Sequence, residues 1–596
     1  MAISRNEFVV LSALAKTGEQ TTAQTLSEVT GLSRERASAA MCSCAERGLL
    51  DAGRITERGI EALEPYRVHN AVIMAAGLSS RFVPLSYERP KGMLRVHEEV
   101  LIERQIRQLL KRGISDITVV VGYKKEYFFY LAAKYGVHIV VNDQYAEKNN
   151  SWTLWLVRDR LSNTYVCSSD DYFTRNPFER YVWKSYYAAE YVSGPTEEWC
   201  LTTDSSDRIT GVTVGGRDSW VMLGHVYFDR EFSRRFVALL DEAIRRPETG
   251  PKLWESIYAD HLDALDMEIR RYPAGVIHEF DSLAELESFD PEFINNVDSE
   301  IFDNIVSVLG CPREDIRDFY PMSQGITNLS CHFSVGGNEY VYRHPGKGTD
   351  KMIDRTTETR ANEAARKLGV DRTFLHEDPE RGWKVCRFIP NARTLDPSNL
   401  TEVGQAMRLC RRIHESGVRL SGSFDFFENG LGYERVLAEH GPIDIPGYAE
   451  LREKVTRLSG LSSADGYEPC FSHNDYLPFN LLFDEKDELN VIDWEYAGMS
   501  DPMNDVATYV ICSEADESAA EKALELYLGH EATARERRHF WSRVVLGGWC
   551  WYVWALAKEA EGAGVGEWLY IYYSYAANNV DRVLSWYEGV PEAASV

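Results

Sequence analysis

Residues 472–480 read Ser-His-Asn-Asp-Tyr-Leu-Pro-Phe-Asn, and residues 491–495 read Val-Ile-Asp-Trp-Glu. Phosphoryl transfer requires a carboxylate beside the acceptor hydroxyl and oxygen ligands that hold Mg²⁺ against the nucleotide phosphates. An aspartate, an asparagine five residues later and a second aspartate at the end of a following strand meet this requirement. The apolar run 481–483 and the strand 489–492 are joined by an acidic turn, so Asn480 and Asp493 are expected side by side. The stretch predicts a phosphoryl-transfer site.

The segment before this motif predicts a nucleotide-binding hairpin. Residues 323–328 (Ser-Gln-Gly-Ile-Thr-Asn) precede a strand, and a Gly-Gly-Asn turn at 336–338 connects it to a returning strand. The loop that is expected to cover the nucleotide phosphates contains Gly325, Thr327 and Asn328. The returning strand ends at Arg343, where a protein kinase carries its lysine.

Together these elements resemble the choline and ethanolamine kinase family over residues 315–580. The resemblance implies an α+β, protein-kinase-like fold, with Asp475 as catalytic base and Asn480 and Asp493 as ligands of Mg²⁺. Glu358 matches the glutamate that is expected to pair with Arg343, and Glu363 is the alternative. Supporting structural roles are expected for the remaining polar residues of the motif, His473, Asp501 and Asp505.

Three tryptophans lie within six residues in Gly-Trp-Cys-Trp-Tyr-Val-Trp, residues 548–554. On a helix Trp551 and Trp554 share a face, and aromatic faces hold a quaternary ammonium, which cannot donate a hydrogen bond. The cluster Trp549, Trp551 and Trp554 therefore predicts a pocket for a cationic head group. An ordinary hydrophobic core is the alternative explanation.

The middle segment, residues 67–295, alternates strands and helices. Buried strands are predicted at 71–75, 117–121, 137–141 and 165–167, with a helix at 101–112. This alternation predicts a parallel, doubly wound sheet with helices on both faces. Such sheets bind ligands at the carboxyl ends of their strands.

The first of these strands runs into Ala-Gly-Leu-Ser-Ser-Arg-Phe at 76–82, and Arg-Pro-Lys-Gly-Met-Leu follows at 89–94. A glycine turn after a buried strand lets backbone amides close on a phosphate chain, and Arg81 adds a fork of donors. This combination resembles the sugar-phosphate-type nucleotidyltransferases, and among them the bacterial phosphocholine cytidylyltransferases, over residues 70–290. The family's fold is an α/β domain with a Rossmann-like mixed sheet.

The resemblance implies that the loop with Gly77, Ser79 and Ser80 wraps the nucleotide triphosphate together with Arg81. Lys91 is implied to hold the phosphate that attacks, so Arg81 and Lys91 are the predicted catalytic residues. Ser79 departs from the family, which often has a second glycine at this position.

Divalent metal is expected because two phosphate-bearing anions must approach each other. Ser-Ser-Asp-Asp at 168–171 follows a predicted strand, and Asp170 falls at the family's metal-binding aspartate. The second family aspartate matches Asp281, which is alternatively a helix cap. In the acceptor pocket, Asn150 resembles a family residue and Trp152 is one of several aromatic candidates.

The first segment, residues 1–66, reads as three short helices followed by a strand, a tight turn and a strand. This order is similar to a winged helix-turn-helix domain. DNA binding would fall to Arg34 and Arg36 on the third helix, but the segment holds seven basic and nine acidic residues. A role in folding or ligand sensing, without DNA, is therefore the favoured alternative.

Composition limits the partners of the chain. Its 596 residues carry a formal net charge of −27, which disfavours nucleic acid and anionic membranes. No signal peptide pattern is present, and the most apolar stretch, 544–557, is too short to cross a bilayer. The 11 cysteines are scattered, so a cytoplasmic protein with reduced thiols is expected.

The three segments, 1–66, 67–295 and 296–596, together predict a multidomain, bifunctional enzyme. The kinase would make phosphocholine from choline and ATP, and the transferase would join it to CTP with release of pyrophosphate, both with Mg²⁺. One alternative keeps both activities but acts on ethanolamine, another amino alcohol or an aminophosphonate. The other is a nucleotide-sensing regulator with degenerate enzyme domains. The oligomeric state is left open.

Overall fold

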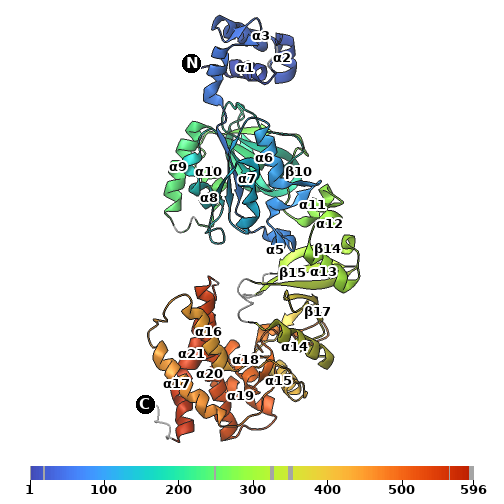
Figure 1. The fold of residues 1–596 in the computed structure, drawn as a ribbon, viewed down its shortest axis with the longest axis vertical. Helices are drawn as coiled ribbons and strands as arrows, with labels where there is room; N and C mark the ends of the chain where they lie inside the picture. Colours follow the sequence, from blue (N-terminus) through green and yellow to red (C-terminus); the bar gives the residue numbers. More distant parts are fainter. Residues whose placement is uncertain are drawn as a thin grey trace. The chain divides into compact units, whose positions relative to one another are not determined.

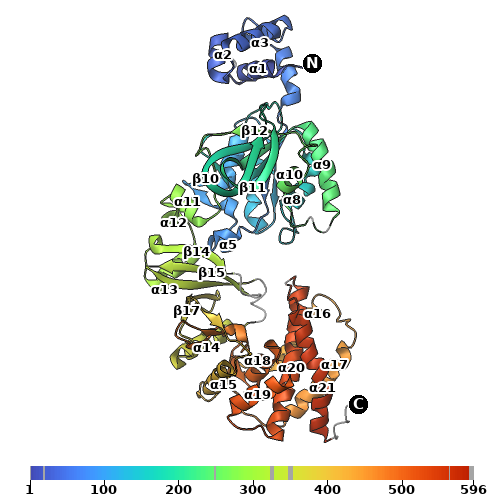
Figure 2. The ribbon, with the colours of Figure 1, turned by 180° about the vertical axis from the view of Figure 1, so that it is seen from behind.

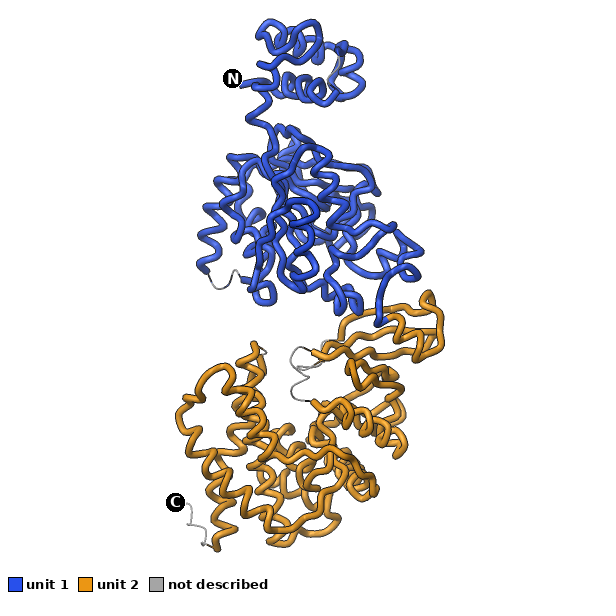
Figure 3. The backbone as a smooth tube through the Cα atoms, viewed as in Figure 1, with its two compact units in different colours: residues 1–301 blue, residues 302–596 orange. Residues whose placement is uncertain are grey.

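The computed structural model of the chain describes residues 2–17, 20–246, 248, 250–322, 328–346, 353–562 and 564–589. The chain divides into two compact units, Met1–Ile301 and Phe302–Val596 (Figure 3). In the part of the chain that is described, no helix is both long and apolar enough to span a bilayer.

The first unit begins with a small helical segment followed by a two-stranded antiparallel hairpin. Its elements are α1 (Arg5–Thr17), α2 (Ala23–Thr30), α3 (Arg34–Glu46), β1 (Leu50–Asp51), β2 (Arg54–Ile55) and α4 (Glu57–Leu63). Ser33 caps α3 by accepting a hydrogen bond from the Arg36 amide. Tyr181 joins the core of this segment, and the Phe8, Tyr66 and Trp183 rings lie 4.9–5.4 Å apart. The segment is therefore packed onto residues 181–183 of the domain that follows.

A seven-stranded sheet forms the centre of the first unit, in the order β12-β10-β11-β8-β3-β6-β7. The strands β3 (Asn70–Ala75), β6 (Asp116–Val121), β7 (His138–Val141) and β8 (Thr164–Ser168) are parallel. The others are β10 (Tyr186–Thr203), β11 (Ile209–Phe228) and β12 (Glu268–Arg271); β11 is antiparallel to both β8 and β10. The expectation of a wholly parallel sheet is thus wrong, because the long β10–β11 hairpin extends the parallel half. The sheet is mixed, as the family resemblance implies.

Helices cover both faces of this sheet (Figures 1 and 2). The apolar side chains of α6 (Leu101–Leu110) and α7 (Tyr130–Tyr135) share one core with the strands. Those of α8 (Asn150–Leu156), α9 (Arg230–Ile244) and α10 (Trp254–Ala259) share the core on the opposite face. The smaller elements are α5 (Leu85–Glu88), β4 (Arg95–Val96), β5 (Glu99–Val100), β9 (Asp171–Phe173), β13 (Ile277–Glu279), α11 (Leu283–Phe289) and α12 (Phe293–Asn296).

The second unit starts with a five-stranded antiparallel sheet in the order β14-β15-β16-β18-β17. The strands of this sheet are β14 (Ile316–Met322), β15 (Asn328–Val335), β16 (Asn338–Pro345), β17 (Phe374–Asp378) and β18 (Trp383–Arg387). Helix α13 (Glu300–Leu309) precedes β14 in the chain, and α14 (Arg355–Leu368) follows β16. The strands β15 and β16 form the predicted hairpin, with Val335 opposite Asn338.

The rest of this unit is mainly helical. Its helices are α15 (Leu400–His414), α16 (Phe426–Ala438), α17 (Tyr448–Ser463), α18 (Met503–Cys512), α19 (Glu517–Leu528), α20 (Ala534–Ala560) and α21 (Trp568–Glu588). Short strands accompany the motif of residues 472–495. They are β19 (Arg393–Thr394), β20 (Cys470–Ser472), β21 (Leu481–Phe483), β22 (Leu489–Val491) and β23 (Gly498–Ser500). At Gly548 of α20, an added Cβ would lie 2.9 Å from backbone atoms of α21, so only glycine permits this close approach.

Candidate active sites

The first site lies where β3 and β8 of the mixed sheet end. The loop 76–79 leaves β3, and Ser79 has a φ of 54°, in the left-handed region. A glycine adopts this conformation without strain, so the backbone explains why glycine suits the position that Ser79 occupies. Ser80 and Arg81 follow in a short 3₁₀ turn, with Arg81 exposed.

Lys91 lies in this site against the end of β8. Its Nζ is 2.7 Å from Asp170 Oδ2, and a Cβ added at Gly92 would lie 2.8 Å from Ser169 Oγ. Burial lowers the pKa of Lys91, but Asp170 and, more weakly, Glu279 and Asp281 outweigh it and raise the pKa above its usual value. Burial conversely raises the pKa of Asp170, and Lys91 holds it below its usual value. The lysine is therefore a charged group inside a ring of carboxylates.

Three carboxylates of this site converge. Asp170, Asp171 and Glu279 each place one oxygen within 4.8 Å of the others. Both carboxylate oxygens of Asp171 are buried and have no hydrogen-bond partner among the described residues. Burial, then repulsion from Glu279 and Asp170, raises the pKa of Asp171 well above its usual value. Desolvation of the carboxylate, and then repulsion from Asp170, also raises the pKa of Glu279 to about 8. The residue as a whole is nevertheless exposed. Hard oxygen donors with an unsatisfied buried carboxylate fit Mg²⁺.

The two aspartates that the sequence selected as metal ligands are placed differently. Asp170 belongs to the three-carboxylate group, whereas Asp281 Oδ1 lies 2.8 Å from Arg81 Nη2. Asp281 is still close enough to raise the pKa of both Lys91 and Glu279. Sequence reasoning missed Asp171 and Glu279, although the Asp-Asp doublet was visible. The alternative that Asp281 caps α11 is wrong, because Ser282 is the residue that caps this helix.

Asn150 connects two helices beside this site. Its Nδ2 donates to Glu255 Oε2 at 3.1 Å, and its Oδ1 accepts from the Trp254 amide at 2.8 Å. Tyr187 also donates to Glu255, and its pKa is raised by burial, by Glu255 and then by Glu279 and Asp171. Burial raises the pKa of Glu255 to about 7. Both amide atoms of Asn150 are thus engaged with α10, close to the carboxylate group.

The Trp152 ring is in contact with two other groups. The Lys148 Nζ lies 3.6 Å from the centre of the ring, and the Trp155 ring stacks on it at 4.6 Å. A cationic ligand would have to displace Lys148 to reach the ring. The lysine shows that this aromatic face attracts a cation.

The second site is built on the catalytic loop between β20 and β21. Asp505 on α18 accepts hydrogen bonds from the His473 and Asn474 amides at 2.9 and 2.5 Å. The His473 Nε2 bonds to the Ile492 carbonyl at 2.8 Å, one residue before Asp493. These bonds hold a loop in which Asn474 and Asp493 have left-handed φ angles of 64° and 65°. Asp505 and His473 therefore occupy the supporting positions expected of them.

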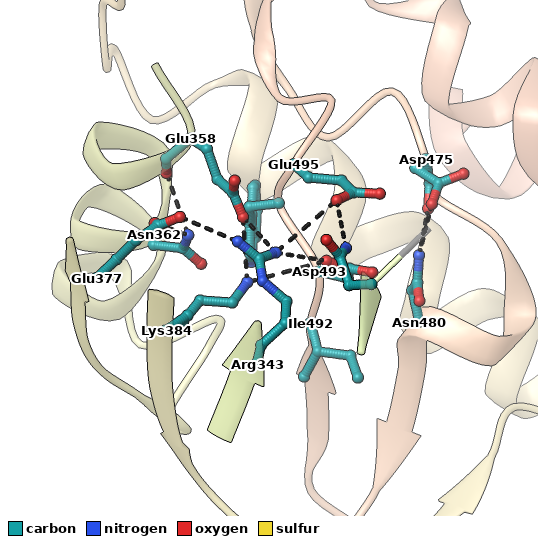
Figure 4. A network of polar contacts seen from close by, with 12 residues as sticks. Arg343, Glu358, Asn362, Glu377, Lys384, Asp475, Asn480, Ile492, Asp493 and Glu495 are labelled. Carbon is teal, nitrogen blue, oxygen red and sulfur yellow. Dashed lines mark hydrogen bonds and ion pairs between the residues drawn. The ribbon is translucent and has the colours of Figure 1, made fainter. Parts of the chain in front are cut away.

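Asp475 and Asn480 meet at the centre of this loop. The Asn480 Nδ2 donates to Asp475 Oδ2 at 2.9 Å (Figure 4). Desolvation, then repulsion from Asp493 and Glu495, raises the pKa of Asp475 well above its usual value. A divalent ion beside Asp493 would offset that repulsion, so the carboxylates and the Asn480 amide oxygen fit Mg²⁺.

Arg343 of β16 lies in a network of carboxylates (Figure 4). Its Nη1 is 2.5 Å from Glu358 Oε1 on α14, the partner that the sequence preferred to Glu363. Other contacts of the guanidinium reach Glu377 at 3.0 Å, Asp493 at 3.5 Å and Glu495 at 3.8 Å. Lys384 of β18 contacts Glu358 at 3.3 Å and Asp493 at 3.9 Å. Sequence reasoning missed Lys384 and Glu377, which no motif marks, and assigned no role to Glu495, the last residue of the 491–495 motif.

The predicted phosphate-covering loop is only partly described. Gly325 and Thr327 lie outside the described residues. Asn328, the first residue of β15, donates from Nδ2 to Glu495 Oε2 at 2.7 Å. This bond places the start of the hairpin beside the Arg343 network.

The three tryptophans of α20 have different surroundings. Trp551 packs on Phe424 and meets Tyr496 edge-on at 5.2 Å, while the Trp554 indole donates to the Tyr496 hydroxyl at 3.1 Å. Tyr496 adjoins Glu495 and Asp475, because its pKa is raised by burial, then by Glu495, with a further contribution from Asp475. Trp549 instead stacks with Phe427, fully buried against Gly430, where no Cβ would fit. The structure places Trp549 in the α16–α20 core, because it lies on another face of the helix.

Comparisons with known proteins agree with these two sites. A family model described as MobA-like NTP transferase domain matches residues 71–174, and one described as Phosphotransferase enzyme family matches residues 319–541. Choline-phosphate cytidylyltransferase of Streptococcus pneumoniae is 33% identical over 226 residues, which are 38% of this chain and 98% of that protein. The chain belongs to the choline-phosphate cytidylyltransferase family.

Within this family the acceptor varies. The 2-aminoethylphosphonate cytidylyltransferase of Lancefieldella rimae is 34% identical over 229 residues, 38% of this chain and 93% of that protein. For the second unit, the solved structure of choline kinase LicA from Streptococcus pneumoniae is 27% identical and covers 48% of this chain and 98% of its own, with a TM-score of 0.41. The chain is thus an enzyme that combines a cytidylyltransferase domain with a phosphotransferase domain, and both predictions of enzyme class are confirmed.

Proposed function

We propose that the chain converts choline to CDP-choline in two steps, with phosphocholine as the intermediate. The observation that supports the proposal is that residues suited to both transfers gather in two separate places of one chain. One combines the Lys91–Asp170 pair with three converging carboxylates, and the other combines Asp475, Asn480 and Asp493 on one loop.

In the kinase step Asp475 accepts the proton of the choline hydroxyl as its oxygen attacks the γ-phosphorus of ATP. The bond between the γ-phosphorus and the bridging oxygen breaks, and ADP leaves. Arg343, which Glu358 orients, and Asn328 are proposed to line the nucleotide site. Asn480 and Asp493 would hold Mg²⁺, which supplies charge neutralisation on the phosphates.

In the transfer step Lys91 binds the phosphate of phosphocholine and directs its oxygen at the α-phosphorus of CTP. The bond from the α-phosphorus to the β-phosphate breaks, and pyrophosphate leaves. The loop with Gly77, Ser79 and Ser80 binds the triphosphate together with Arg81. Asp170 and Asp171, with Asp281 in reach, would hold Mg²⁺.

The aromatic group on α20 supports choline over ethanolamine. Tyr496, which is in contact with Trp551 and Trp554, lies within electrostatic range of Asp475, near which an ammonium head would have to sit when its hydroxyl reacts. An aminophosphonate remains the second candidate for the transferase, because a relative that is named for 2-aminoethylphosphonate is equally similar.

Residues 1–66 are proposed to be a winged helix that serves the fold rather than DNA. Their core includes Tyr181 of the transferase domain, and Arg34 and Arg36 are exposed beside Glu35. A mobility-shift assay with the DNA upstream of the coding sequence tests this proposal. A specific shift would favour a regulator.

Phosphorus NMR of the purified chain with Mg²⁺, ATP, CTP and choline tests the two activities. Phosphocholine followed by CDP-choline is expected. The Asp475→Asn variant should leave choline unphosphorylated but still convert added phosphocholine to CDP-choline. The Lys91→Ala variant should phosphorylate choline and accumulate phosphocholine. Failure with choline, combined with turnover of ethanolamine or 2-aminoethylphosphonate, would replace the substrate and keep the enzyme class.

A further inference from the structure

The kinase site holds a second buried cation that no sequence motif marks. Lys384 of β18 lies directly opposite Arg343 of β16 in the antiparallel sheet, and the two residues are only 6% and 5% exposed. Like charges that face each other across a sheet are destabilising, and burial increases their repulsion. A buried pair of cations at this position therefore calls for an explanation beyond folding.

The carboxylates around Arg343 supply part of that explanation. Its guanidinium contacts Glu358, Glu377, Asp493 and Glu495, all within 3.8 Å. An arginine so surrounded has little positive charge to offer an incoming polyphosphate. It acts mainly to order the carboxylates, one of which is the expected metal ligand Asp493 (Figure 4).

A charge count identifies what Lys384 adds. The described network contains three cations, Arg343, Arg355 and Lys384, against the same four carboxylates. With every group ionised, the network carries one net negative charge, and removal of Lys384 would raise this to two. Lys384 also lies 3.3 Å from Glu358 and 3.9 Å from Asp493, so it adjoins the metal ligand.

We infer that Lys384 is the second cation of the nucleotide site, and that it offsets the surplus carboxylate charge so that the polyphosphate of ATP can bind beside Asp493. The inference rests on the proposed kinase function and names a residue for the nucleotide within that site. Its effect is electrostatic, so it should grow with the number of phosphates on the nucleotide.

The test compares the neutral variants Lys384→Met and Lys384→Gln with the wild-type chain. Isothermal titration calorimetry with Mg²⁺ present should show ATP binding weakened by about tenfold or more, as expected when a nearby charge is removed in a low-dielectric site. ADP should be weakened less and AMP by under about twofold, while the KM for choline stays within about twofold. Lys384→Arg keeps the charge and should recover most of the ATP affinity.

Arg387→Met is the matched control, because it removes an exposed cation from the same strand and should leave ATP binding unchanged. Equal weakening of ATP, ADP and AMP would overturn the inference and assign Lys384 a structural role. The same conclusion would follow if neither neutral variant folded, or if Lys384→Arg bound ATP as poorly as Lys384→Met. Absence of choline phosphorylation by the wild-type chain would instead refute the proposed function, and the calorimetric comparison would still stand.

Discussion

Replacement of Asp171 by asparagine should have opposite effects in the absence and presence of metal. Without metal, the Asp171 carboxylate is buried, lacks hydrogen-bond partners among the described residues and is repelled by Glu279 and Asp170. The neutral amide removes that repulsion. In the presence of Mg²⁺ the same substitution removes a charged ligand of the ion. The variant should therefore lack the increase in unfolding free energy that Mg²⁺ binding gives the wild-type chain.

The size of each effect follows from the structure. Asparagine leaves a buried polar group but carries no charge, so Asp171→Asn in EDTA should gain the cost of ionising Asp171, about 1.4 kcal/mol for each unit by which burial and the neighbouring carboxylates raise its pKa. The folded-state pKa of Asp171 is raised, so its stabilising contribution is complete below the unfolded pKa of about 4 and is lost as pH rises through the folded pKa. The advantage of the variant should therefore be larger at pH 8 than at pH 5. At a Mg²⁺ concentration of about 100 times its Kd, the wild-type chain should gain about 2.7 kcal/mol that the variant lacks.

The assay is thermal unfolding in EDTA and in Mg²⁺. The transition to compare is the one whose midpoint shifts when CTP is added, because it reports the transferase domain. Asp143 is exposed, and Asp143→Asn is the matched control, which should leave the unfolding temperature unchanged both in EDTA and in Mg²⁺. A destabilised Asp171→Asn protein in EDTA, or one that keeps the full response to Mg²⁺, would refute the assignment of Asp171 to the metal site.

Five further substitutions test other parts of the two enzyme units. Gly92→Ala should lower the transferase rate by about tenfold or more with normal kinase activity, because its Cβ would push the Lys91 turn off the adjacent serine. Gly77→Ala meets no atom within 4 Å, so it should fold normally, and any weaker CTP binding, measured by calorimetry, would then report a contact with the nucleotide. Glu255→Gln should make the free energy of unfolding less dependent on pH. The pKa of Glu255 is raised to about 7, so the wild-type chain loses up to about 3 kcal/mol of stability as pH rises from 5 to 8. Urea unfolding at both pH values measures this difference. Trp549→Ala should destabilise the kinase unit by about 3–5 kcal/mol, whereas Trp554→Leu should mainly raise the KM for choline; urea unfolding and kinase kinetics separate the two results.

The residues that sequence reasoning placed together are those whose relation is local. Asp475, Asn480 and Asp493 lie within 19 positions, and one loop and one short hairpin bring them together. Lys91 and Asp170 are 79 positions apart, but each follows a recognisable family motif. The β15–β16 hairpin was likewise predicted from a short-range signal, the Gly-Gly-Asn turn at 336–338.

What the sequence could not predict depends on contacts between distant strands. Lys384 reaches Arg343 only because β16 and β18 are neighbours, and the stretch Trp-Lys-Val-Cys-Arg carries no motif. Glu279 joins Asp171 because β13 pairs with β9, a pairing between segments 108 residues apart. The antiparallel β10–β11 hairpin was missed because its outer half is exposed and lacks a continuous apolar run.

The two unrelated sites share an electrostatic arrangement that explains why each should require a divalent ion. Each holds a buried cation, Lys91 or Arg343, in contact with carboxylates that outnumber the nearby cations. Where the surplus is greatest, protons are held more tightly: the pKa of Asp171 and of Asp475 is raised by neighbouring carboxylates after desolvation. A divalent ion would displace those protons, so Mg²⁺ binding should release protons near neutral pH. The released proton leaves Asp475 ionised, which is the form that can accept the hydroxyl proton, and metal binding and base activation become one event.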